Sequence, residues 1–148
     1  LLHPRVLPPL RTAVPLQISR TRDTIEGPRP VRPVDLALLA GTWVNFDAAS
    51  TGVHHLEIED RNGQLILRTW GTGAPEPRSW GEVIAEPFTD GVALHEAVAF
   101  RAGYDFGFAR VMLACYLNKR LLVVDAYTVF QDGSGRSPYF QRDHFYIP

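Results

Sequence analysis

Charged and aromatic side chains share the same face of three segments near the end of the chain. Because successive residues of a strand point to opposite sides, counting by two gives each face. The mixed faces are Phe108, Arg110, Met112 and Tyr116; Val123, Asp125, Tyr127 and Val129; Tyr139, Gln141, Asp143 and Phe145; and Phe140, Arg142, His144 and Tyr146. A charge that points into a protein interior must be paired or must meet a ligand. An inward mixed face therefore predicts a small-molecule site, which is mostly apolar with a few fixed polar groups.

Two sets of residues are the candidates for ligand binding. The rings expected at the open end of a barrel are Trp70, Trp80, Tyr104, Phe106 and Phe108. The groups expected in its interior are Arg110, Tyr116, Asp125, Tyr127 and Arg142, whose charged members come from three consecutive strands and could pair there. An alternative stays open, because the outer surface of a small barrel also carries arginine and tyrosine with their polar ends in water.

Four residues are candidates for acid/base or hydrogen-bond catalysis by residue type: Tyr127, Asp125, Glu82 and His144. Burial can move the pKa of a carboxyl or imidazole group toward neutral, and a tyrosine hydroxyl can stabilise developing charge. The loop 132–136, Asp-Gly-Ser-Gly-Arg, lacks the patterns of a nucleophile elbow and of a phosphate loop. The histidines show no metal-ligand spacing, so neither a metal nor a cofactor is predicted.

A short motif, Trp70-Gly71, is repeated ten residues later as Trp80-Gly81, on the two sides of a proline-containing loop. Aromatic residues at matching positions of adjacent strands favour a symmetric hairpin in which the two rings pack together across the pair. The alternative is a ligand mouth lined by the two rings.

Eight short segments of alternating pattern would hold these side chains in place. They are expected near 42–47, 53–60, 64–70, 79–86, 92–102, 106–117, 120–130 and 138–147. Asn62-Gly63 and Asp90-Gly91 predict tight hairpins with positive φ. No long segment of helical period separates the strands, which argues against a parallel α/β fold. The predicted fold class is all-β, an eight-stranded antiparallel up-and-down barrel.

The chain divides into an arm and one domain. Residues 1–34 hold seven of the twelve prolines and six arginines, which predicts a Pro-rich extended N-terminal arm. This arm is expected either to be partly disordered or to cover a barrel mouth. Residues 35–148 are predicted to form a single β-barrel domain. Asp35 is expected to cap a short helical turn, residues 36–39, that plugs one end of the barrel.

Composition limits the partners. Fifteen basic and sixteen acidic residues give a net charge of −1, so nucleic acid is not a predicted partner. The apolar runs are too short to span a bilayer, and we expect no membrane insertion. We expect a soluble protein that is cytoplasmic, or secreted after loss of a signal peptide, and an oligomer is compatible with the sequence. The lone Cys115 lies in an apolar run and is predicted to be a small buried hydrophobe.

The stretch 38–43, Leu-Leu-Ala-Gly-Thr-Trp, precedes this series of strands. It resembles the start of lipocalins and of the wider calycin group, which includes the avidins. The resemblance implies that Trp43 closes the barrel floor and that an arginine of the last strand, here Arg142, packs over it. The Thr-Asp-Tyr motif of typical lipocalins is absent, and no C-terminal helix is expected after the last strand. The comparison therefore moves toward avidin-like barrels and bacterial barrel cyclases of natural-product pathways.

Three functions follow as hypotheses. The first is a barrel that binds a small, largely apolar or amphipathic molecule in its interior, with affinity from apolar burial and orientation from the polar groups. The second is a barrel cyclase or isomerase that folds a natural-product intermediate into a reactive conformer. The third is a filled structural or interaction barrel with no ligand.

Overall fold

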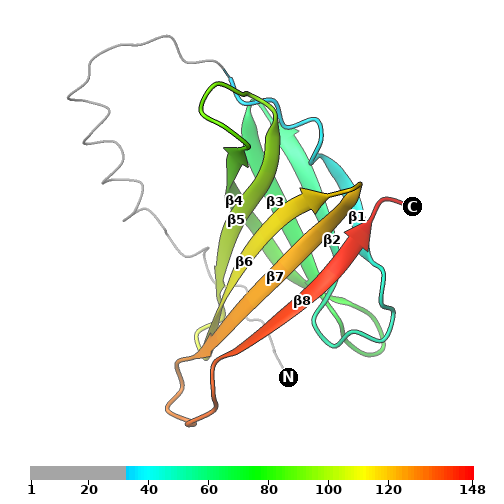
Figure 1. Cartoon of the computed structure of the whole chain (residues 1–148). Helices are drawn as coiled ribbons and strands as arrows, with labels where there is room; N and C mark the ends of the chain where they lie inside the picture. Colours follow the sequence, from blue (N-terminus) through cyan, green and yellow to red (C-terminus); the bar gives the residue numbers. More distant parts are fainter. Residues whose placement is uncertain (1–32) are drawn as a thin grey trace, which may run out of the picture.

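The computed structural model describes residues 33–148, so most of the arm predicted for residues 1–34 lies outside the described residues. Eight strands follow one another in this part (Figure 1): β1 Gly41–Asn45, β2 Val53–Arg61, β3 Gln64–Gly71, β4 Arg78–Thr89, β5 Ala97–Asp105, β6 Ala109–Asn118, β7 Leu121–Phe130 and β8 Tyr139–Tyr146. Each pairs antiparallel with its neighbour in sequence, and β8 pairs with β1 to close the barrel. The predicted all-β, eight-stranded up-and-down barrel is confirmed.

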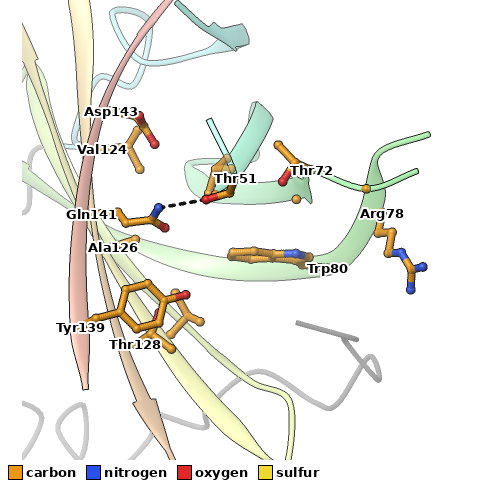
Figure 2. A pocket seen from close by; sticks show the side chains of 15 residues that line it. Thr51, Thr72, Arg78, Trp80, Val124, Ala126, Thr128, Tyr139, Gln141 and Asp143 are labelled. Atoms are coloured by element: carbon orange, nitrogen blue, oxygen red, sulfur yellow. Dashed lines mark hydrogen bonds between the residues drawn. The ribbon is translucent and has the colours of Figure 1, made fainter. Parts of the chain in front are cut away.

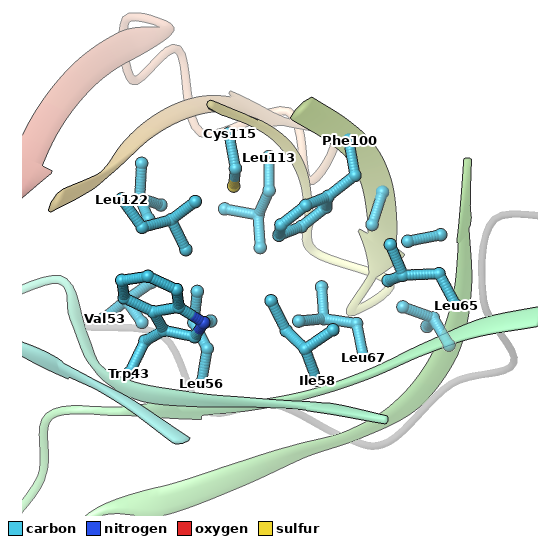
Figure 3. Close-up of a cluster of buried hydrophobic side chains, with 14 of the residues drawn as sticks. Trp43, Val53, Leu56, Ile58, Leu65, Leu67, Phe100, Leu113, Cys115 and Leu122 are labelled. Atoms are coloured by element: carbon cyan, nitrogen blue, oxygen red, sulfur yellow. The ribbon is translucent and has the colours of Figure 1, made fainter. Parts of the chain in front are cut away.

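The barrel core is apolar and comes from the inward side chains of every strand. Figure 3 shows residues from opposite walls pointing toward one another, among them Leu56, Leu67, Phe100, Leu113 and Leu122. These side chains are at most 2% exposed. They fill the part of the barrel near the end where β5 begins and β6 ends, so this part is packed with protein.

A turn at residues 36–39 closes that end of the barrel, which we call the plug end. Leu36 and Leu39 are fully buried there, and the Trp43 indole donates a hydrogen bond of 2.8 Å to the Leu39 carbonyl oxygen. Trp43 therefore lies at the barrel floor. The expected helical turn is instead a hydrogen-bonded turn, because only Leu39 and Ala40 donate to the Leu36 carbonyl before the chain becomes extended. The Asp35 carboxylate still caps it, accepting from the Ala37 amide at 2.9 Å.

The tight turns follow the predicted chemistry in one of two places. Asn62 and Gly63 adopt φ of 55° and 87°, as a two-residue hairpin turn requires. Asp90-Gly91 instead begins a longer loop, in which the Leu94 amide donates to the Gly91 carbonyl oxygen and β5 starts only at Ala97. A further tight turn between β6 and β7 places Lys119 and Arg120 at positive φ without a glycine.

Two further findings concern the burial of Cys115 and the length of helices. Cys115 is 2% exposed, as predicted, and burial raises the pKa of its thiol. Among the residues that the structure describes, no helix has the length and apolar character needed to cross a membrane.

Candidate functional site

The backbone pairing of β8 with β1, which closes the barrel, is short. The short strand β1 pairs with β8 only at Val44–Tyr146 and Asn45–Phe145, and the Phe46 amide adds one more hydrogen bond to His144. Beyond this point the chain bends into the β1–β2 loop, residues 46–52, while residues 139–143 of β8 pair with β7 on one side only. The backbone ladder therefore has a gap between these two segments at the open end of the barrel.

A cavity of about 340 Å³ occupies this gap, and we call it the seam pocket. Its walls come from the β1–β2 loop, the β3–β4 loop and the inward faces of β4, β6, β7 and β8 (Figure 2). The lining residues are Thr51, Gly52, Val53, Gly71, Thr72, Gly73, Arg78, Trp80, Val111, Val124, Ala126, Thr128, Tyr139, Gln141 and Asp143. This volume lies within the range of small-molecule sites in proteins.

The seam pocket has an apolar back wall and a polar rim. Trp80, Val111, Val124 and Ala126 supply the apolar surface, and Trp80 is only 4% exposed. Hydroxyl, amide and carboxylate groups surround it, from Thr51, Thr72, Thr128, Tyr139, Gln141 and Asp143. Such a surface can bury the apolar body of a ligand while the rim orients its polar groups.

The β1–β2 loop is held in place by side-chain hydrogen bonds at its start. The buried Asn45 amide donates to the Val53 carbonyl oxygen at 2.9 Å, and its Oδ1 accepts from the Asp47 amide at 2.8 Å. The loop also binds the β3–β4 loop, because the Thr72 amide donates to the Gly52 carbonyl oxygen at 2.9 Å. Two loops of the pocket wall are therefore fixed relative to each other.

The pocket side of β8 contacts this loop through two polar side chains, Asp143 and Gln141. The Gly52 amide donates to Ser50 Oγ at 3.1 Å, and the Ser50 hydroxyl donates to Asp143 Oδ2 at 3.0 Å. Gln141 Nε2 lies 3.5 Å from Thr51 Oγ1. Because the Ser50 hydroxyl proton is used by Asp143, its oxygen is free to accept from Gly52, and both bonds are satisfied together.

Two glycines allow side chains to lie close to the pocket wall. A Cβ atom at Gly71 would be 2.5 Å from Trp80 Nε1, and a Cβ atom at Gly52 would be 2.9 Å from Gln141 Oε1. Neither separation is tolerated between such atoms, so the Trp80 and Gln141 side chains occupy their places because these two positions have no side chain.

Four of the five rings predicted at the open end lie together. Trp80 meets Tyr104 and Phe106 edge to face, with ring centroids 5.4 and 5.2 Å apart, and Phe106 stacks with Phe108 at 6.4 Å. Tyr104 and Phe106 are each 2% exposed, so they support Trp80 from behind and do not line the pocket themselves. This aromatic cluster fixes the position of Trp80, the member of the cluster that reaches the cavity.

The Tyr104 hydroxyl has polar partners inside this cluster. It lies 3.0 Å from Thr69 Oγ1 and 3.1 Å from the Gly81 carbonyl oxygen, so it can accept from the threonine and donate to the carbonyl. Burial disfavours the charged phenolate and raises the pKa of Tyr104. The hydroxyl is therefore a structural hydrogen-bonding group that stays protonated.

Trp70 does not belong to this cluster. It is on the outer face of β3 and stacks on His55, with ring centroids 4.4 Å apart and planes 9° from parallel. The expected packing of Trp70 against Trp80 is wrong because the pairing of β3 with β4 shifts between Thr69 and Trp70, next to a positive φ at Gly81. This irregularity leaves the two indoles on opposite faces of the sheet.

The residues expected in the interior lie on the outside of the barrel. Arg110, Tyr116, Asp125, Tyr127 and Arg142 alternate with inward residues along β6, β7 and β8. The interior placement predicted for them is corrected, because the other face of β7 packs inward through the apolar Leu122, Val124 and Ala126 and through Thr128. The open alternative, an outer surface that carries rings and charges, describes their position.

Asp125 and Arg142 do form an ion pair, but outside the barrel. The guanidinium donates from Nε and Nη2 to the two carboxylate oxygens at 2.7 and 2.9 Å, and these hydrogen bonds raise the pKa of Arg142. The resemblance to calycins implied that Arg142 packs over Trp43. This expectation is wrong, because Arg142 lies on the outside of the barrel and binds Asp125. No ion pair connects Arg110 to Asp125 in residues 33–148, so the predicted three-residue ladder is reduced to one pair.

The four candidate catalytic residues are not in the seam pocket. Tyr127, Asp125 and His144 are on the outer face of β7 and β8, and Glu82 is on the outer face of β4. Glu82 accepts hydrogen bonds from Arg61, which lower its pKa, and belongs to a surface network with Glu59 and Arg68. These positions give the four residues no shared cavity.

Sequence reasoning missed most of the pocket lining. Tyr139, Gln141 and Asp143 share one face of the last strand with Phe145, and the full burial of Phe145 shows that this face points inward. The loop residues Thr51 and Thr72 carry no local signal, because they reach the pocket only through the gap beside β8.

No protein family model, no curated protein and no solved structure matches this chain.

Proposed function

We propose that this protein binds one small amphipathic organic molecule in the seam pocket. The observation that carries the proposal is the cavity of about 340 Å³, with its apolar back wall at Trp80 and Ala126 and its polar rim on β8 and the adjoining loops. The plug end of the barrel is filled with side chains, so a ligand would bind in the seam pocket. We also propose that the chain is a calycin-like barrel, on the basis of the short turn before Trp43 and the eight-strand meander.

The seam pocket is suited to a ligand that is partly exposed. The pocket lies at the open end of the barrel, so an apolar group can rest against Trp80 while a polar group stays at the rim. For a ligand of about 17 non-hydrogen atoms, an affinity on the order of 10–100 μM follows from usual ligand efficiencies. A natural ligand with matched polar groups would bind more tightly.

Binding of N-phenyl-1-naphthylamine tests this function, because its fluorescence rises when it enters an apolar site. Ala126→Phe places a ring in the cavity, and Ala99→Phe makes the same change on the outer face of β5. We expect Ala126→Phe to weaken binding at least about tenfold and Ala99→Phe to leave it unchanged. Thermal unfolding shows whether each variant keeps the fold. Equal binding by both variants would place the probe elsewhere and refute the proposal.

A further inference from the structure

The only acidic side chain that lines the seam pocket is Asp143. It is half-buried on the inward face of β8, two residues before the buried Phe145. Its Oδ2 accepts from Ser50, whereas Oδ1 accepts no hydrogen bond from residues 33–148. No lysine, arginine or histidine of the same residues lies within ion-pair distance of this carboxylate. A half-buried carboxylate that has an unused acceptor and no counter-charge is suited to accept charge-assisted hydrogen bonds from a cationic ligand.

The hydrogen bonds around Asp143 set the polarity of this side of the pocket. Gly52 donates to Ser50, so the serine proton is directed to Asp143 and holds the carboxylate as an acceptor. Gln141 is on the same face of β8 as Asp143, and its Oε1 is 2.9 Å from the place that a Cβ atom at Gly52 would take. Two acceptors therefore stand side by side on β8, and a group with several N–H donors matches them better than a group that only accepts.

The cationic side chain of the pocket lies elsewhere. Figure 2 shows Asp143 and Gln141 on the β8 wall and Arg78 on the opposite side, with its guanidinium turned away from the other labelled side chains. The apolar Trp80 indole lies between these two walls. An aromatic or aliphatic body against Trp80 would thus point its polar end toward the β8 acceptors.

We infer that the seam pocket selects small molecules with a protonated amine attached to an apolar body, and that Asp143 is the group that binds the ammonium. This inference rests on the proposed function and adds the class of ligand. The body would lie against Trp80 and Ala126, and the ammonium would donate to Asp143 Oδ1 and to Gln141 Oε1. The ammonium and Asp143 would both stay in partial contact with water. Because dissolved ions screen such a pair, the interaction is expected to weaken as salt is added.

Three probes with one naphthalene skeleton test the inference: 2-naphthylmethylamine, 2-naphthylmethanol and 2-naphthoate, which are cationic, neutral and anionic at pH 7. Their affinities are measured by calorimetry with the full chain, and the site is located by amide chemical shifts of β8 and the β3–β4 loop. We expect the amine to bind roughly tenfold more tightly than the alcohol, and the carboxylate to bind least. We also expect the amine, and not the alcohol, to lose affinity between about 20 mM salt, where screening is weak, and about 500 mM salt, where it is strong.

Asp143→Asn removes the charge and keeps the size of the side chain. It should bring the amine to the affinity of the alcohol and leave the alcohol unchanged. Asp60→Asn is the matched control, because Asp60 caps the β2–β3 hairpin at the other end of the barrel and contributes the same charge. It should preserve the preference for the amine. The wild-type comparison of probes needs no variant, so the inference stays testable even where Asp143→Asn lowers stability.

The outcomes separate the two proposals. Equal affinities of the three probes, with shifts in the seam pocket, would overturn the ligand class and leave the proposed function standing. Tightest binding of the carboxylate would overturn it as well and would direct attention to Arg78. No shift of any pocket residue with any probe would refute both. Loss of the amine preference in Asp60→Asn as well as in Asp143→Asn would show a general effect of charge and would overturn the role of Asp143.

Discussion

The Arg142 guanidinium binds the Asp125 carboxylate through two parallel hydrogen bonds on the outside of the barrel, and the two partners differ sharply in exposure. The Asp125 side chain is 8% exposed and the Arg142 side chain is 50% exposed. Removal of the arginine would leave an almost buried carboxylate without its partner, whereas removal of the acid would leave an arginine that water can solvate. The energetic role of the pair is therefore asymmetric.

We expect Arg142→Gln to lower the free energy of unfolding more than Asp125→Asn does, because only the first change leaves a nearly buried charge without its partner. Urea unfolding at pH 7 measures both. Arg101→Gln is the control, because Arg101 and Glu86 form a pair in which both side chains are well exposed. A larger loss in Asp125→Asn than in Arg142→Gln would contradict this account.

Trp43 and Trp70 offer a comparison between two tryptophans of one barrel. Trp43 is 3% exposed and donates to Leu39, whereas Trp70 stacks on His55 at the surface. Trp43→Phe leaves a cavity and an unpaired carbonyl oxygen, so we expect a loss of about 2–4 kcal/mol in the free energy of unfolding. Trp70→Phe should cost less than about 1 kcal/mol. Guanidinium unfolding followed by circular dichroism checks both, and similar losses would remove Trp43 from the barrel floor.

Tyr104 should make the barrel sensitive to alkali. Burial raises the pKa of its hydroxyl in the folded state, so above the ordinary pKa near 10 the unfolded chain releases a proton that the folded chain keeps. The stabilisation is complete below about pH 10 and is lost as pH rises, by up to about 1.4 kcal/mol per pH unit. Tyr104→Phe lacks this slope.

The measurement is the free energy of unfolding between pH 9 and 12. These values bracket the ordinary tyrosine pKa of about 10. Burial also raises the pKa of the Cys115 thiol, which adds a slope of the same sign, so both proteins carry Cys115→Ala. The two pH profiles should then diverge above about pH 10. Parallel profiles would mean that the Tyr104 hydroxyl titrates equally in the folded and unfolded states.

Alternation and turn chemistry were sufficient to predict the order of the strands. The Asn62-Gly63 hairpin and the period of two along β6, β7 and β8 are local properties, and local properties determine which residues share a face. The Lys119-Arg120 turn carries no such signal, because neither residue is selected for positive φ, and its conformation is imposed by the pairing of β6 with β7.

Which face points inward is a property of the closed barrel. Both faces of β7 hold valines, so the valines alone do not show which face points inward. The face that carries Leu122 and Val124 is the more apolar one, and the face that carries Asp125 and Tyr127 therefore points outward. The seam pocket depends on a longer-range feature, the early end of β1 beside β8. No local pattern near Thr51 or Asp143 encodes that gap, and the pocket was therefore not predictable from spacing alone.

Gly71 tests how strictly the pocket wall is built. A Cβ atom there would stand 2.5 Å from Nε1 and 3.1 Å from Cε2 of Trp80, so the indole must move in Gly71→Ala. The φ of Gly71 is one that alanine adopts, and the expected loss of about 1–3 kcal/mol comes from overpacking alone. In Gly91→Ala the nearest atom is 3.6 Å away, which makes it a matched control with little loss. Chemical unfolding measures both variants.

The smaller ring of phenylalanine at position 80 should relieve this clash. Trp80→Phe alone leaves a void beside Tyr104 and costs stability, but with Gly71→Ala the methyl group takes part of the vacated space, so the two losses should add to more than the loss in the double variant. The same displacement of Trp80 should weaken binding of N-phenyl-1-naphthylamine in Gly71→Ala and spare it in Gly91→Ala. Strictly additive losses would show that Gly71 and Trp80 are not in contact, because independent sites do not couple.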